Sequence, residues 1–136
     1  EVLLKAGPFT EADREVMRQH VKIGSKLLSG SVAPLLQMAR EIALTHHERW
    51  DGTGYLGIKG TQIPLSGRIA AVADAFDVMT HRNGAKSPMT LAQARAEIEN
   101  QAGKQFDPEL SAFFLRLIDR DGEMLLSEPS PVRLVA

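Results

Sequence analysis

Two adjacent histidines stand directly before a glycine-rich loop in the stretch HHERWDGTGYLG, residues 46–57. Imidazole nitrogens bind transition metals, and so much glycine suits a sharp turn or a ligand that approaches the backbone. His46 and His47 are therefore either metal ligands or polar residues that end a helix. His20 and Asp74 are further candidate ligands, because each falls on another predicted helix.

This candidate ligand set combines imidazole with carboxylate, which suits Mn, Fe, Co, Ni or Zn. Neighbouring residues of a helix point about 100° apart. We therefore expect His46 and His47 to serve different ions of a multi-metal cluster. Two metals about 3.5–4 Å apart are the usual apparatus for hydrolysing phosphate esters. The spacing alone indicates a possible metal hydrolase.

Other interpretations of the same residues stay open on the pattern alone. His20 could be a surface or satisfied core histidine. Asp74 lies among apolar residues, where a carboxylate is costly unless it is paired or binds metal. The alternative to metal binding is an ion pair of Asp74 with Arg49 or Arg68.

The hydrophobic spacing predicts the elements that must position these side chains. It gives helices over about 11–28, 31–48, 65–81, 90–102 and 108–120. Thr10 with Asp13 and Thr90 with Gln93 predict N-terminal caps. The helix at 65–81 is apolar nearly all round and is expected to be central, and the tail 121–136 is expected to be extended. The fold class is therefore an all-α bundle of about five helices.

The composition excludes several classes of function. The 136 residues suit one domain, and the net charge of −1 gives no general attraction to nucleic acid polymers. The chain has no cysteine, which excludes disulfides, thiolate zinc sites and cysteine nucleophiles. No apolar run approaches the length of a membrane span, so we expect a cytoplasmic protein.

The run HHERWDGTGYLGIKGTQIPLSGRIAAVADAFDVMT resembles the HD-GYP domains, a branch of the HD metal-dependent phosphohydrolases that degrades cyclic di-GMP. The flanking segments EVLLKAGPFTEADREVMRQHVKIGSKLL and AGKQFDPEL extend the likeness over roughly residues 1–115. The resemblance implies a helix bundle of the HD type, with part of such a domain at 1–120 and a C-terminal tail at 121–136. It also implies a cyclic di-GMP phosphodiesterase in bacterial second-messenger signalling.

The resemblance also assigns roles to individual residues. His20, His46, His47 and Asp74 match the family's metal ligands, which hold iron or manganese in a bi- or trinuclear centre. The expected substrate contacts are Arg68, Lys86, Gly54 and Tyr55. A cyclic dinucleotide is the expected ligand. A GGDEF-type signalling domain at the GYP loop and an upstream sensor or receiver domain are possible partners.

Three departures from the family pattern affect the expected activity. The His-Asp pair followed by Gly-Lys is absent, and we expect it about a dozen residues before Glu1, so the catalytic residues are unassigned. Leu56 replaces the signature proline, and Asn83-Gly84-Ala85 replaces the family's Arg-Pro-Tyr. This chain alone is therefore expected to hydrolyse slowly or not at all.

Two alternatives remain. One is a degenerate, non-catalytic module that senses cyclic di-GMP or binds a signalling partner. The other is a phosphohydrolase that acts on a different nucleotide.

Overall fold

The computed structural model describes residues 10–81 and 87–126, which form five α-helices and one short 3-10 helix. They are α1 (Glu11–Leu27), α2 (Pro34–Thr45), η2 (Gly60–Gln62), α3 (Leu65–Thr80), α4 (Leu91–Gln101) and α5 (Pro108–Leu126). The predicted all-α bundle is confirmed.

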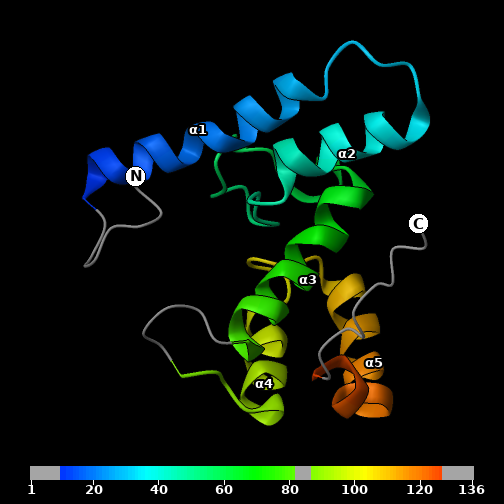
Figure 1. Cartoon of the computed structure of the whole chain (residues 1–136). Coiled ribbons are helices and arrows are strands. Elements are labelled where there is room, and N and C mark those ends of the chain that lie inside the picture. Colours follow the sequence, from blue (N-terminus) through cyan, green and yellow to red (C-terminus); the bar gives the residue numbers. More distant parts are fainter. Residues whose placement is uncertain (1–9, 82–86, 127–136) are drawn as a thin grey trace, which may run out of the picture.

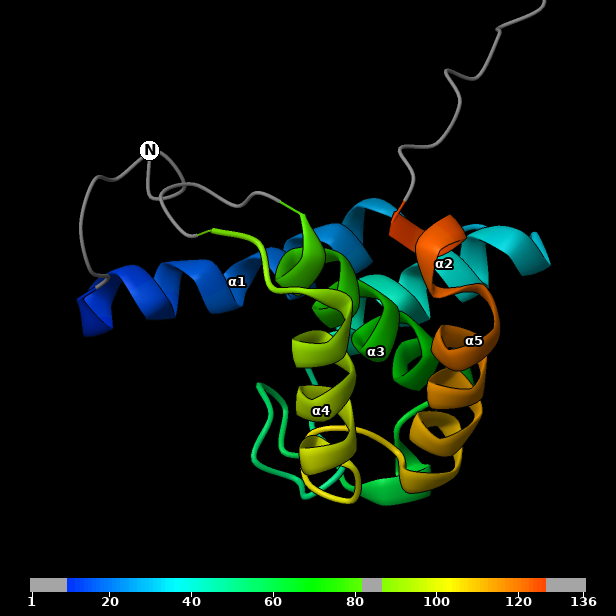
Figure 2. The same cartoon turned by 90° about the horizontal axis from the view of Figure 1, so that it is seen from below.

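Helix α3 connects the two halves of the molecule. It packs against α2 at one end and against α4 and α5 at the other, while α1 lies along α2 (Figure 1). The view from below shows α3, α4 and α5 grouped around a common interior (Figure 2). The buried apolar residues of this interior are Val72, Phe76, Ala94, Ile98, Phe106 and Ile118. This core holds α3 in place, and the opposite end of α3 meets the helix pair that carries the histidines.

The predicted helix starts are confirmed at three places. Thr10 with Asp13 and Thr90 with Gln93 form reciprocal capping boxes, which satisfy backbone N–H groups in the first turn. The Asp107 carboxylate accepts hydrogen bonds from two backbone N–H groups of the first turn of α5, at 2.8 and 3.3 Å.

Helix α2 is shorter at both ends than the predicted 31–48. It begins at Pro34, because proline suits the first helical position and holds the preceding Ala33 in an extended conformation. It ends at Thr45, whose buried hydroxyl donates to the Glu41 carbonyl at 2.6 Å. Glu48 therefore lies outside the helix.

Helix α3 packs against α2, α4 and α5 and is central, as expected, but part of its apolar surface is exposed. Ile69 and Val78 are about half exposed, at 49% and 47%, and the Asp74 side chain is exposed as well. Asp74 therefore has access to water and needs no ion pair to avoid a burial penalty. Neither α3 nor any other helix in the described ranges is long and apolar enough to cross a membrane.

The expected extended tail is wrong for residues 121–126, which continue α5 beyond a break at Asp121. Asp121 has non-helical angles (φ −127°, ψ 16°). Gly122 is buried, and a Cβ there would lie 2.4 Å from Leu91 Cδ2, so glycine allows this turn to pack closely on α4. Leu125 and Leu126 then pack against the core. Apolar contact therefore favours a further stretch of helix after the break at Asp121.

The crossing of α2 and α3 depends on glycine at position 67. A Cβ at Gly67 would lie 2.0 Å from Thr45 Oγ1 and 2.9 Å from Thr45 Cβ. We predict that Gly67→Ala lowers the free energy of unfolding by about 1–3 kcal/mol, because the helices would have to separate. Urea denaturation measures this change.

Gly24→Ala in α1 is the matched control for that variant. Its Cβ would meet Ala43 at 3.5 Å, an ordinary contact, and alanine favours a helix over glycine by about 1 kcal/mol. This variant should be as stable as the wild type or more so. Equal losses in the two variants would contradict the close crossing.

Candidate metal centre

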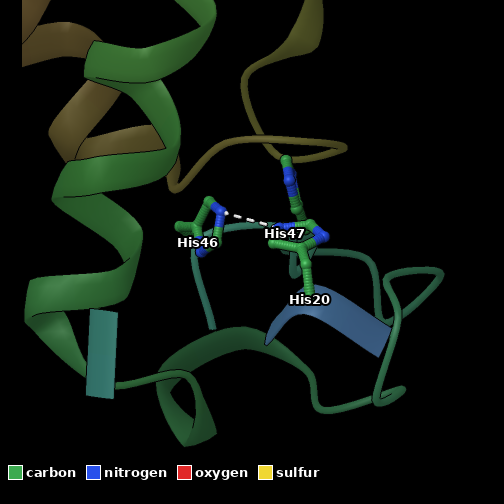
Figure 3. A group of neighbouring side chains, drawn as sticks. All are labelled: His20, His46 and His47. Carbon is green, nitrogen blue, oxygen red and sulfur yellow. Dashed lines mark hydrogen bonds between the residues drawn. The ribbon is translucent and has the colours of Figure 1, made fainter. Parts of the chain in front are cut away.

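Three histidine side chains converge between α1 and the end of α2 (Figure 3). His20 comes from α1, His46 caps the C-terminus of α2, and His47 follows it. One ring nitrogen from each lies within 4.8 Å of the others, and all three residues are partly buried. Among the described residues, this is the cluster of potential ligands that could hold a metal ion.

The backbone fixes which nitrogen two of these rings present. His20 Nδ1 contacts the Met17 carbonyl, and His46 Nδ1 donates to the Ile42 carbonyl at 2.9 Å. A carbonyl only accepts, so each Nδ1 carries the hydrogen and each Nε2 of a neutral ring has a lone pair. Metal-binding histidines usually have this arrangement, in which the non-ligating nitrogen donates to a carbonyl or carboxylate.

The two Nε2 atoms of His20 and His46 lie 3.4 Å apart, as the dashed line in Figure 3 marks. With both Nδ1 atoms protonated, two neutral rings would direct lone pairs at each other. An additional proton on one ring, or a cation between the rings, removes this repulsion. The donor set therefore fits a divalent metal.

His47 joins the cluster because α2 has ended. The ring centroids of His46 and His47 are 4.1 Å apart, and that of His47 lies 5.0 Å from the ring of His20. The expectation that the adjacent pair could not easily share one ion assumed that both residues were helical. This assumption is wrong for His47, which lies in the turn after Thr45.

The environment of His47 favours its neutral form. Burial and, to a smaller extent, the neighbouring His46 and His20 together lower its pKa from 6.5 to about 4, while Asp74 opposes them. A neutral imidazole has the lone pair that a metal requires. His47 is therefore ready to bind a metal at neutral pH without first losing a proton.

Asp74 lines the same cavity as His46 and His47, on the α3 side. The cavity has a volume of about 530 Å³, and its wall also includes Tyr55 and apolar residues of α3. Asp74 does not belong to the group of mutually close ligand atoms, although its charge acts on His47. Its role as a ligand stays a prediction.

Glu48 is a site residue that the sequence reasoning missed. Its side chain is buried, at 3% exposure, and its two carboxylate oxygens accept from the backbone N–H groups of Leu56 at 2.7 Å and Ile58 at 3.1 Å. The carboxylate thereby ties the glycine-rich loop to the turn that carries His47. An acidic residue directly before a glycine-rich loop was the available sequence signal.

Gly54 and Tyr55 bring this loop against the histidines. A Cβ at Gly54 would lie 2.6 Å from Glu48 Cα, so only glycine allows the two backbones to approach so closely. The Tyr55 ring then lies 5.0 Å from the ring of His47 and remains 40% exposed. Contact of either residue with a substrate stays a prediction.

Arg68, one of the expected substrate contacts, is engaged elsewhere in the described structure and not with the histidines. Arg68 forms a 2.6 Å ion pair with buried Asp107, donates to the Ile63 carbonyl and lies over the Trp50 ring. These contacts indicate a structural role, and its phosphate contact stays a prediction without geometric support. Lys86 and the segment 83–85 lie outside the described residues.

Comparison with known proteins identifies the family. Residues 1–110 match the model of the HD domain. A cyclic di-GMP phosphodiesterase of Thermotoga maritima is 51% identical over 85% of this chain and 32% of its own length. The cyclic di-GMP phosphodiesterase response regulator RpfG of Xanthomonas campestris is 46% identical over 85% of this chain and 31% of its own length. A 3'3'-cGAMP-specific phosphodiesterase 2 of Vibrio cholerae is 42% identical over 84% of this chain and 22% of its own length.

The chain belongs to the HD domain family, and its relatives place it with the HD-GYP proteins that its sequence resembles. It spans about a third or less of the length of these curated relatives.

The pKa of His47 predicts how the stability of the metal-stripped protein depends on pH. In the unfolded chain the His47 imidazole binds a proton near pH 6.5, whereas in the folded protein it does so only near pH 4. Stability should therefore fall as the pH drops from about 6.5 to about 4, and His47→Gln should make this decline shallower. Urea denaturation at several pH values measures it, with His81→Gln, outside the cluster, as the control. Identical slopes in wild type and His47→Gln would contradict the assignment.

The carboxylate of Glu48 predicts a local effect on the loop. Glu48→Gln replaces one accepting oxygen with an amide donor, so one backbone N–H loses its partner. We expect a loss of about 1–3 kcal/mol and faster amide hydrogen exchange at Leu56 and Ile58. Glu41→Gln is the control, because among the contacts described the exposed Glu41 carboxylate accepts only from the Ser66 hydroxyl. Unchanged exchange at both amides in Glu48→Gln would refute this role.

Proposed function

We propose that the protein containing this chain is a metal-dependent phosphodiesterase that hydrolyses cyclic di-GMP in bacterial second-messenger signalling. The observation that carries the proposal is the convergence of three imidazoles, two of which are oriented by backbone carbonyls. The relatives named as cyclic di-GMP phosphodiesterases, up to 51% identical, support the substrate.

We propose iron or manganese as the metal, in a bi- or trinuclear centre. Bound divalent metals supply an activated water and neutralise phosphate charge. His20 and His46 would bind through Nε2, with the Met17 and Ile42 carbonyls holding their rings in place. His47 would add a third nitrogen, and Asp74 a carboxylate from the α3 wall of the cavity.

The cavity beside the histidines has the size and lining for a nucleotide. Its volume of about 530 Å³ is within the range of ligand pockets, and its apolar wall suits a flat base. Tyr55 borders both this cavity and a second groove beside α1. Lys86 is proposed as a phosphate contact from the resemblance alone.

The exposed side of the glycine-rich loop supports a proposed protein partner. Tyr55 and Leu56 are 40% and 37% exposed while Glu48 holds their backbone. A GGDEF-type domain could bind there, and a sensor or receiver domain would precede this one in the full-length protein.

The replacement of the signature proline by Leu56 favours a second candidate, a non-catalytic module that binds cyclic di-GMP. The intact histidine cluster favours the enzyme.

One assay on the full-length protein separates the two candidates. We predict that anaerobically purified protein contains iron or manganese and cleaves cyclic di-GMP. The His46→Ala, His47→Ala double variant should bind less metal, because two ligands are removed. Its activity should fall at least about 100-fold. His81→Ala is the control and should keep both. Bound metal without turnover would favour the sensing module, and full activity in the double variant would refute the ligand assignment.

A further inference from the structure

The part of the cavity lining that α4 supplies carries a pair of side chains that the metal chemistry does not use. Glu97 and Gln101 lie one turn apart on α4, and both line the cavity that also contains His46 and His47. Gln101 Nε2 donates to Glu97 Oε1 at 3.0 Å, and both residues are partly buried. The hydrogen bond fixes the two side chains relative to each other.

This pair presents mainly acceptors to the cavity. A carboxylate has about four lone-pair positions, and the bond from Gln101 uses one of them. Glu97 can therefore accept two further parallel hydrogen bonds. Gln101 contributes its carbonyl oxygen as another acceptor, since its amide nitrogen already faces Glu97.

The neighbouring wall is apolar and adaptable. Ala75, Val78 and Met79 of α3 and Met89 before α4 line the same cavity. Methionine sulfur packs well against aromatic rings, and its flexible side chain adjusts to them. A flat heterocycle could lie on this surface while its edge meets Glu97.

We propose, on the basis of the proposed function, that Glu97 recognises guanine in the substrate. Guanine presents two adjacent donors on its pairing edge, N1–H and the exocyclic N2 amine, which match the two carboxylate oxygens. Adenine presents an unprotonated N1 there, which a carboxylate repels. Glu97 thus selects guanine over adenine at this position. A cyclic dinucleotide with one guanine and one adenine still offers a guanine to Glu97, so Glu97 does not discriminate against that ligand.

The test compares ligands that differ only in the base. Dissociation constants for cyclic di-GMP and cyclic di-AMP are measured on the metal-stripped full-length protein, and kcat/KM on the metal-loaded protein. Wild type should prefer cyclic di-GMP. Glu97→Gln should weaken the binding of cyclic di-GMP by roughly 10- to 100-fold, because a charged acceptor is lost. Cyclic di-AMP should be unaffected or bind better, because the new amide can donate to adenine N1.

Glu99→Gln is the matched control, the same change on the exposed face of α4, where Glu99 pairs with Arg95. It should keep the wild-type ratio of the two ligands. The cyclic dinucleotide of inosine, which lacks the N2 amine, provides a test on the unaltered protein. It should bind wild type about tenfold more weakly than cyclic di-GMP, and the difference should shrink in Glu97→Gln.

The outcomes separate this inference from the proposed function. Guanine-selective binding that depends on Glu97, without any cleavage, would support the inference and reject the phosphodiesterase. Cleavage of cyclic di-GMP with an unchanged guanine-to-adenine ratio in Glu97→Gln would reject the inference alone. A wild type that neither binds nor cleaves either ligand would overturn both.

Discussion

The close approach of His20 and His46 is the constraint around which this part of the molecule is organised. Their Nε2 atoms lie 3.4 Å apart while their Nδ1 atoms are held by backbone carbonyls. Two neutral rings in that geometry repel each other unless a proton or cation lies between them. The packing of α1 along α2 maintains the approach, and α2 is anchored by its crossing with α3 at Gly67. Helix packing thus provides the free energy that holds the ligands together before any metal binds.

A single buried carboxylate links the ligand turn to the surface loop. Glu48 lies one residue after His47 and accepts from two backbone N–H groups of the loop. The loop is therefore hydrogen-bonded to the residue that directly follows His47. The close contact of Gly54 with the Glu48 backbone reinforces this link, and it places the Tyr55 ring beside His47. The glycines and the glutamate of this segment thus have a physical role that is distinct from that of the histidines.

Much of the fold could be predicted from the sequence because its signals are local. Capping boxes at Thr10 and Thr90 and proline at the start of α5 mark where helices begin, and hydrophobic spacing marks their buried faces. One error was local, because Pro34 marks the start of α2 and the predicted start at residue 31 missed it. The other errors arose where tertiary contacts decide. Nothing local shows that α2 ends at Thr45 or that Gly122 packs against Leu91 to extend α5.

The candidate site divides in the same way. The three histidines were predicted from their residue types and their resemblance to a known family, and the structure brings them together. The roles of Glu48 and Arg68 depend on partners outside their own helix or turn. Glu48 binds Leu56 and Ile58, and Arg68 pairs with Asp107, 39 residues away. Such pairings follow from the fold and not from spacing.

Anomalous X-ray diffraction from crystals of the full-length protein grown with Mn²⁺ tests the central claim most directly. The account predicts an anomalous peak within bonding distance of Nε2 of His20 and of His46, with a ring nitrogen of His47 also bound to the centre. Well-ordered histidines without a peak between them, or manganese bound only elsewhere, would contradict it.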